Sequence, residues 1–125
     1  MGTKALISSY RIVDEGLDKA IEAKIIIDRD ISRHYTYQDL ARMVATNQQK
    51  LLISFKEVTR KNLYQYLTYV RIEKAMYLLE TTTLTVERIA SKVGLDKTNL
   101  NKQFKKIHGT TPNAWRKNLW KTNRY

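Results

Sequence analysis

Residues 85–105, "TVERIASKVGLDKTNLNKQFK", carry the pattern that decides the fold. Apolar residues recur at helical spacing on both sides of Gly94, and lysines and amides fill the positions between them. Thr85 and Asp96 can each cap a helix, while Gly94 can take the left-handed conformation of a turn. The stretch therefore predicts a helix-turn-helix unit, with helices over 86–92 and 97–108.

The same pattern occurs 49 residues earlier, in "TYQDLARMVATNQQKLLISFK" at 36–56. The two stretches align without a gap, and the matched positions are mostly apolar. A repeat that keeps its apolar spacing while its polar residues differ indicates one structural unit used twice. Here the pattern predicts helices over 37–43 and about 48–58, capped by Thr36 and Asn47. Ala45 replaces the turn glycine, at a cost on the order of 1 kcal/mol.

The outward face of each second helix differs in chemistry between the two copies. In the second copy it carries Lys97, Thr98, Asn101, Lys102 and Lys105. In the first copy it carries Gln48, Gln49, Lys50, Leu52 and Ile53. Amides and donors suit base edges in the DNA major groove, and flanking cations suit phosphates. Leu52 and Ile53 could contact thymine methyls or pack as extra core under a connecting helix, and both interpretations stay open here.

The remaining segments supply a connector and two packing helices. Residues 63–80 form an amphipathic pattern about 27 Å long at 1.5 Å per residue, enough to hold two units near the roughly 34 Å spacing of successive major grooves. Residues 14–31 predict a first packing helix, with Leu17, Ile21 and Ile25 on one face. Thr111 and Pro112 open a closing helix. Further positions expected in the core are Tyr66, Tyr69, Leu79, Leu100, Phe104, Ile107 and Trp115.

These segments predict an ordered division of the 125 residues. The parts are an N-terminal extension or linker (1–13), a first helix-turn-helix subdomain with its packing helix (14–62), the connecting helix (63–80), a second subdomain with its closing helix (81–121) and a tail (122–125). With 42% hydrophobic residues, the chain can bury a core of this size.

Charge is distributed unevenly along the chain. The 23 basic and 12 acidic residues give a net charge of +11, and residues 1–35 hold six of each sign. All the excess positive charge therefore lies in residues 36–125, and no acidic residue follows Asp96. A field of one sign on a small domain favours a polyanionic partner, with nucleic acid ahead of an anionic membrane.

Other chemistry is sparse in this sequence. Cysteine is absent, and no apolar run reaches the roughly 18 residues of a membrane span. The two histidines, His34 and His108, lie far apart, and no nucleophile with a nearby base and no phosphate-binding glycine loop occurs. We therefore expect a cytoplasmic protein that is not an enzyme, with no metal, no cofactor and no small-molecule site.

Across residues 15–117 the chain resembles the DNA-binding domain of the AraC/XylS family of bacterial transcription regulators. The connecting stretch contributes Tyr66, Leu67, Arg71, Ala75, Leu78, Leu79, Thr83, Ile89, Ala90, Val93 and Gly94 at the family's spacings. The closing signature is Phe104, Lys105, Lys106, Gly109, Thr111, Pro112 and Arg116. Departures from the family pattern are Ala45, Ile53, Arg60 and Trp115.

The resemblance implies an all-α fold of about seven helices, in which two helix-turn-helix subdomains are joined by one long helix. It also implies a sequence-specific regulator that binds double-stranded DNA and, as an activator, touches RNA polymerase. The predicted base-reading residues are Gln48, Gln49, Leu52, Ile53, Thr98, Asn101 and Lys102. The predicted phosphate contacts are Thr36, Lys56, Arg60, Lys61, Thr85, Lys97, Lys105, Lys106, Thr111 and Arg116.

Two further expectations accompany this reading. Arg71 is expected to form a structural bridge with a carboxylate such as Asp39. The alternative function is a basic helical interaction module that binds an acidic protein or nucleic acid without sequence choice. Amides such as Asn101 distinguish the two functions, because they add nothing to an electrostatic patch but suit base edges.

Overall fold

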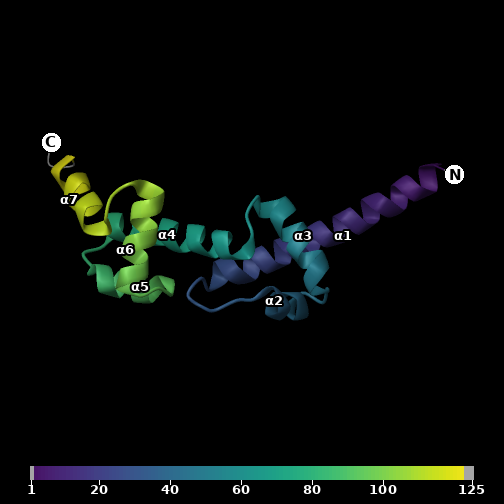
Figure 1. The fold of residues 1–125 in the computed structure, drawn as a ribbon, viewed down its shortest axis with the longest axis horizontal. Coiled ribbons are helices and arrows are strands. Elements are labelled where there is room, and N and C mark those ends of the chain that lie inside the picture. Colours follow the sequence, from purple (N-terminus) through teal and green to yellow (C-terminus); the bar gives the residue numbers. More distant parts are fainter. Residues whose placement is uncertain (1, 123–125) are drawn as a thin grey trace. The chain divides into compact units, whose positions relative to one another are not determined.

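A computed structural model describes residues 2–122. Within that range the chain forms seven α-helices and no strand, which confirms the predicted all-α class (Figure 1). The helices are α1 (Gly2–Arg29), α2 (Tyr37–Met43), α3 (Gln48–Thr59), α4 (Leu63–Thr81), α5 (Val86–Val93), α6 (Lys97–His108) and α7 (Pro112–Thr122). No helix in this part of the chain combines the length and apolar character needed to cross a membrane.

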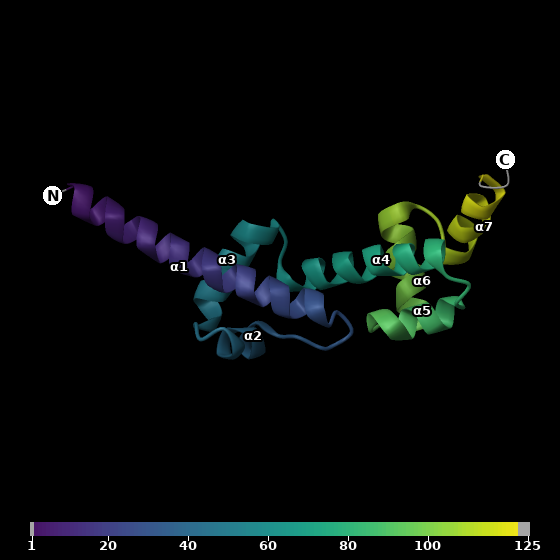
Figure 2. The ribbon, with the colours of Figure 1, turned by 180° about the vertical axis from the view of Figure 1, so that it is seen from behind.

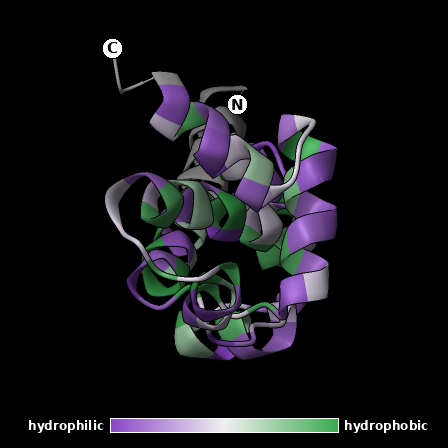
Figure 3. Ribbon diagram, turned by 90° about the vertical axis from the view of Figure 1, so that its left-hand side faces the viewer, coloured by the Kyte–Doolittle hydropathy of each residue, from purple (hydrophilic) through white to green (hydrophobic). Residues whose placement is uncertain are grey.

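The helices belong to two compact units. Unit 1 extends to Asp30 and also contains His34–Leu67, whereas unit 2 contains Ile31–Arg33 and the chain from Thr68 onward. The division falls inside α4, the predicted connecting helix. Most helices alternate hydrophilic and hydrophobic residues along their turns, as expected when one side of each faces a core (Figure 3).

In unit 1, α3 crosses α1, and α2 lies beside them (Figures 1 and 2). The buried face of α1 consists of Ala20, Ala23 and Ile27, whereas Ile21 and Ile25 are 44% and 45% exposed. The apolar stripe of Leu17, Ile21 and Ile25 is therefore not the buried face of α1: Leu17 is half-buried and both isoleucines are exposed. Small alanine side chains let the backbones of α1 and α3 approach closely, which larger side chains would prevent. Helix α1 also begins at Gly2, so it includes most of the predicted linker.

In unit 2, α4, α5 and α6 surround a core in which Leu79, Leu100 and Phe104 are fully buried. Trp115 of α7 packs against this core, with its ring 6.1 Å from that of Phe104, as predicted. Tyr69 and Ile107 were expected in the core, but each is 43% exposed. At the end of α6, the ring of His108 lies 4.8 Å from that of Phe104, and His108 takes the place expected for Ile107.

The loop after α1 contributes three residues to unit 2. Arg71 donates from Nε to the carbonyl of Ile31 at 2.7 Å and from a terminal nitrogen to that of Arg33 at 2.9 Å. Asp39, the expected partner of Arg71, instead pairs with Arg42 at 2.9 Å. Arg71 thus has a structural role, but through backbone carbonyls that sequence spacing does not indicate.

Candidate nucleic-acid interface

The turn between α2 and α3 is set by side-chain caps and one left-handed residue. The Thr36 hydroxyl accepts a hydrogen bond from the Asp39 N–H at 3.0 Å, and the Asn47 side chain accepts one from Lys50 N–H at 2.8 Å. Ala45 has φ 57°, which confirms the left-handed conformation predicted for it. These contacts begin α3 at Gln48, the residue that the sequence predicted.

The inner side of α3 is fixed by an aromatic cluster. The buried Phe55 ring lies 6.2 Å from Tyr37 and 5.3 Å from Tyr66, edge-on to both. The Tyr66 hydroxyl donates to the Asp28 carboxylate at 2.6 Å, and the Tyr37 hydroxyl accepts from Leu63 N–H at 2.8 Å. Sequence reasoning missed Tyr37 and Asp28 because both contacts join residues far apart in the chain. The cluster fixes the inner side of α3, and the opposite side of this helix is exposed to solvent.

All the predicted reading residues of α3 lie on its exposed side. Gln48 and Gln49 are exposed, and Leu52 and Ile53 are 45% and 58% exposed. The interpretation of Leu52 and Ile53 as extra core is therefore wrong. They give the outward face of this helix an apolar centre flanked by two amides.

The end of α3 supplies the predicted cations of unit 1. Lys56 is exposed, and Arg60 is an exposed left-handed residue (φ 60°) whose N–H donates to the Lys56 carbonyl at 2.9 Å. Lys61 is half-buried, and its N–H donates to the Thr59 hydroxyl. Lys56 and Arg60 are thus placed at the surface, whereas Lys61 is partly covered.

The turn between α5 and α6 follows the same plan with glycine at its centre. The Thr85 hydroxyl accepts from Arg88 N–H at 3.2 Å, and the Asp96 carboxylate accepts from Asn99 N–H at 2.7 Å. Gly94 has φ 83°, and a Cβ at this position would lie only 2.6 Å from the Ser32 carbonyl oxygen. Glycine is therefore required both by the conformation and by the space.

The outward face of α6 is polar and cationic. Thr98, Lys102, Lys105 and Lys106 are exposed, and Asn101 is half-buried beside them. Lys97 lies at the first turn, with its Nζ 3.4 Å from a Glu87 carboxylate oxygen. Leu100 and Phe104 are fully buried on the other side, so core packing determines which residues of α6 face outward. This is the arrangement that the sequence pattern predicted for the second copy.

Three threonines cap the starts of α2, α5 and α7. The Thr36, Thr85 and Thr111 hydroxyls each accept one backbone N–H of the following helix. The first N–H groups of each helix have no intrahelical partner and can bind an anion such as phosphate. The Thr36 hydroxyl, followed by the Arg42 guanidinium, also holds the pKa of Asp39 below its usual value, which keeps this carboxylate ionised at the start of α2.

Arg116 has a different place from the one predicted. It is only 8% exposed, and its guanidinium donates to the carbonyls of Leu79, Leu84 and Thr82 at 3.1, 2.5 and 3.2 Å. Burial lowers its pKa. The prediction of a phosphate contact is therefore wrong, because these donors already bind the chain itself. The available signal was its spacing, four residues after the buried Pro112 and hence on the same face of α7.

Comparison with known proteins places this geometry in a family. A family model described as a helix-turn-helix domain matches residues 40–118. The chain is 29% identical over 101 residues to the HTH-type transcriptional activator RhaR of Salmonella schwarzengrund. The aligned region covers 80% of this chain and 35% of RhaR. The chain spans about a third of the length of the curated relatives it matches.

The fold is shared with several solved structures, of which two are the following. One is the C-terminal domain of the two-component response regulator yesN from Fusobacterium nucleatum, at 31% identity and a TM-score of 0.68, covering 75% of this chain and 93% of that one. The other is the DNA-binding domain of AdpA in complex with a target DNA, at 22% identity and a TM-score of 0.73, covering 78% and 88%. The chain belongs to the AraC/XylS family of helix-turn-helix proteins, as its motifs predicted.

Proposed function

We propose that this chain is a sequence-specific transcription regulator that binds double-stranded DNA through α3 and α6. One observation carries the proposal: in each unit a capped turn and a buried apolar side fix a second helix whose outward face is exposed. This is the geometry in which a recognition helix enters a major groove. The names of the similar proteins support it, since one is a transcriptional activator and one was solved on its target DNA.

The residues divide into readers and positioners. Thr98, Asn101 and Lys102 on α6, with Gln48 and Gln49 on α3, offer hydrogen bonds to base edges, while Leu52 and Ile53 offer apolar contact to thymine methyls. Phosphate contacts come from cations at the surface, among which Lys61 is partly covered, and from helix starts. Such contacts carry no sequence information themselves. These are Thr36, Lys56, Arg60, Lys61, Thr85, Lys97, Lys105, Lys106 and Thr111.

We further propose an activator that contacts RNA polymerase and works in the cytoplasm. The name of RhaR, a transcriptional activator, supports activation. The polymerase contact and the cytoplasmic location are inferred from the family resemblance. The proposal that α3 and α6 enter successive major grooves predicts a bound site with two half-sites about one helical turn, or roughly 34 Å, apart. A footprint confined to a single half-site would contradict it.

The competing function is a basic interaction module without sequence choice, which the net charge of +11 alone would allow. A competition experiment separates the two functions. A duplex selected from random DNA is bound first, and unrelated duplex of equal length is then added at fixed salt. We expect the selected site to be favoured by about a thousandfold or more. Equal competition by unrelated duplex would support the interaction module instead.

A further inference from the structure

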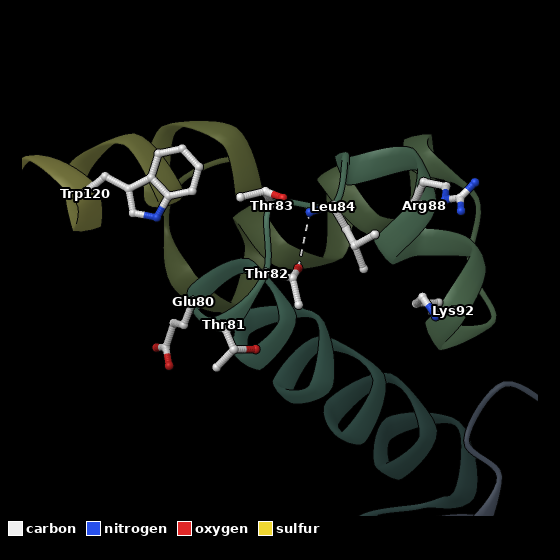
Figure 4. Close-up of a pocket in the computed structure, with 8 residues that line it drawn as sticks. All are labelled: Glu80, Thr81, Thr82, Thr83, Leu84, Arg88, Lys92 and Trp120. Carbon is white, nitrogen blue, oxygen red and sulfur yellow. Dashed lines mark hydrogen bonds between the residues drawn. The ribbon is translucent and has the colours of Figure 1, made fainter.

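Unit 2 carries a groove that the DNA-reading residues do not form. Its volume is about 760 Å³, and its walls come from the end of α4, the α4–α5 loop, α5 and α7 (Figure 4). No residue of α6 lines it. The groove is therefore a surface without a role in the proposed reading of bases.

The aromatic ring of Trp120 lines the groove and stacks on Arg116. Trp120 is 44% exposed, and the guanidinium carbon of Arg116 lies 5.3 Å from the centre of its ring. The same guanidinium donates to the carbonyls of Thr82 and Leu84, which also line the groove. Arg116 thus connects Trp120 of α7 to the α4–α5 loop. A rigid aromatic side chain loses little conformational freedom when a partner binds it.

The charges of the groove have a polarity. Arg88 and Lys92 lie one turn apart on α5, both exposed, and neither side chain has an ion pair among the residues that the structure describes. Glu80 lies by the end of α4, apart from these two cations in Figure 4. An acidic ligand is therefore attracted to the α5 side and repelled from the Glu80 side.

We propose that this groove binds an acidic peptide segment of a partner protein. A large apolar side chain of the segment packs on Trp120, and its carboxylates pair with Arg88 and Lys92. Tryptophan, tyrosine and arginine are enriched among the energetically dominant positions of protein interfaces. The DNA backbone fits less well, because a duplex along the groove would bring phosphates against the Glu80 carboxylate and leave the indole ring without an apolar partner. The proposal does not depend on sequence-specific DNA binding.

The test uses the full chain, labelled with nitrogen-15, and a defined probe. The probe is an acetylated and amidated decapeptide with four aspartates around one phenylalanine; its controls replace the aspartates by asparagine or the phenylalanine by alanine. We expect amide shifts to concentrate at Thr82, Leu84 and Arg88 and at the Trp120 indole. Both control peptides should bind about tenfold more weakly.

Two pairs of substitutions with equal charge change separate the groove from α6. Arg88→Gln with Lys92→Gln should weaken peptide binding about tenfold, and Trp120→Ala should do the same. Lys102→Gln with Lys105→Gln removes the same charge and should change peptide affinity by less than about twofold, while reducing DNA affinity. All four glutamines replace exposed side chains, so folding should be preserved and can be checked from the same spectra.

Three results would overturn the proposal. Shifts concentrated on α3 or α6, or equal weakening by both glutamine pairs, would show only general attraction to a basic protein. Loss of DNA affinity by the α5 pair as large as that by the α6 pair would make the groove a phosphate-binding surface. If the wild-type chain shows no sequence-specific DNA binding, the proposed function fails, but the peptide measurements still decide the role of the groove.

Discussion

The two helix-turn-helix units solve the same folding problem with different residues. Unit 2 uses glycine at both left-handed positions, Gly94 and Gly109, whereas unit 1 uses Ala45 and Arg60 at φ 57° and 60°. Each non-glycine residue in this conformation costs about 1 kcal/mol. Unit 1 must offset that strain elsewhere, and its Phe55–Tyr37–Tyr66 cluster is one contribution. The turn geometry can therefore be maintained by packing where the local sequence does not favour it.

The outward faces differ more than the scaffolds. At positions matched by the repeat, unit 1 exposes Leu52 and Ile53, and unit 2 has Asn101 and Lys102. Leu51 and Phe55 are as well buried as their counterparts Leu100 and Phe104. Packing thus fixes which positions face outward, and the residues there can change without disturbing the fold. This difference leads us to expect unequal contributions to base recognition.

The largest expected effect is a loss of stability that is confined mainly to unit 2. Leu79 is fully buried in the core of unit 2, so Leu79→Ala should lower its free energy of unfolding by about 2 to 5 kcal/mol. Hydrogen exchange measured residue by residue should show the loss in α5 and α6, with smaller changes in α2 and α3. Unchanged thermal stability would mean that our assignment of the buried face of α4 is wrong.

The turns provide the next comparison. Gly94→Ala should destabilise unit 2 by roughly 2 kcal/mol or more, because the new Cβ meets the Ser32 backbone and φ is 83°. The matched change, Ala45→Gly, relieves strain but increases the freedom of the unfolded chain, so its net effect should stay within about 1 kcal/mol. Chemical denaturation of both variants gives the two values. Equal destabilisation by the two substitutions would contradict the proposed difference between the two turns.

Base discrimination should also divide between the units. Asn101→Ala or Lys102→Ala should each remove about 1 to 3 kcal/mol of discrimination in one half-site, and Ile53→Ala should remove less in the other. Binding to a panel of single-base-substituted duplexes measures both. Loss of discrimination in the Ile53→Ala variant alone would mean that α3 contributes more to base recognition than α6.

The smallest effect expected is that of a single phosphate contact. Lys105→Ala should weaken binding to every sequence alike and reduce the slope of log affinity against log salt by about 0.9. Lys121→Ala removes the same charge from an exposed position on α7 outside the predicted interface, and is the matched control. A change of base preference in Lys105→Ala would mean that Lys105 reads bases.

Local signals explain what could be predicted from the sequence. The helices α2 to α6 lie within one residue of their predicted ends. The starts of α2, α3, α5 and α6 are set by the capping residues Thr36, Asn47, Thr85 and Asp96 at the expected positions. The outward residues of α6 followed from the same periodicity. Both features depend on neighbours within a few residues.

Contacts between distant segments explain the errors. Arg116 binds carbonyls 32 to 37 residues away, and carbonyl partners leave no mark in side-chain spacing. Large apolar residues form a stripe on one side of α1 in the sequence, whereas the buried side of this helix consists of Ala20, Ala23 and Ile27. A charge or a hydrophobic stripe shows that a residue can take a role, and only the packed structure decides whether it does.

The central claim is that α6 reads more sequence than α3, and selection of bound sites from random duplex DNA tests it most directly. The wild-type chain and the variants Asn101→Ala and Ile53→Ala would be selected in parallel at the same salt concentration. The wild type should yield two half-sites about one helical turn apart, with the stronger base preferences in the half-site that Asn101→Ala relaxes. Stronger preferences in the half-site relaxed by Ile53→Ala would contradict the account.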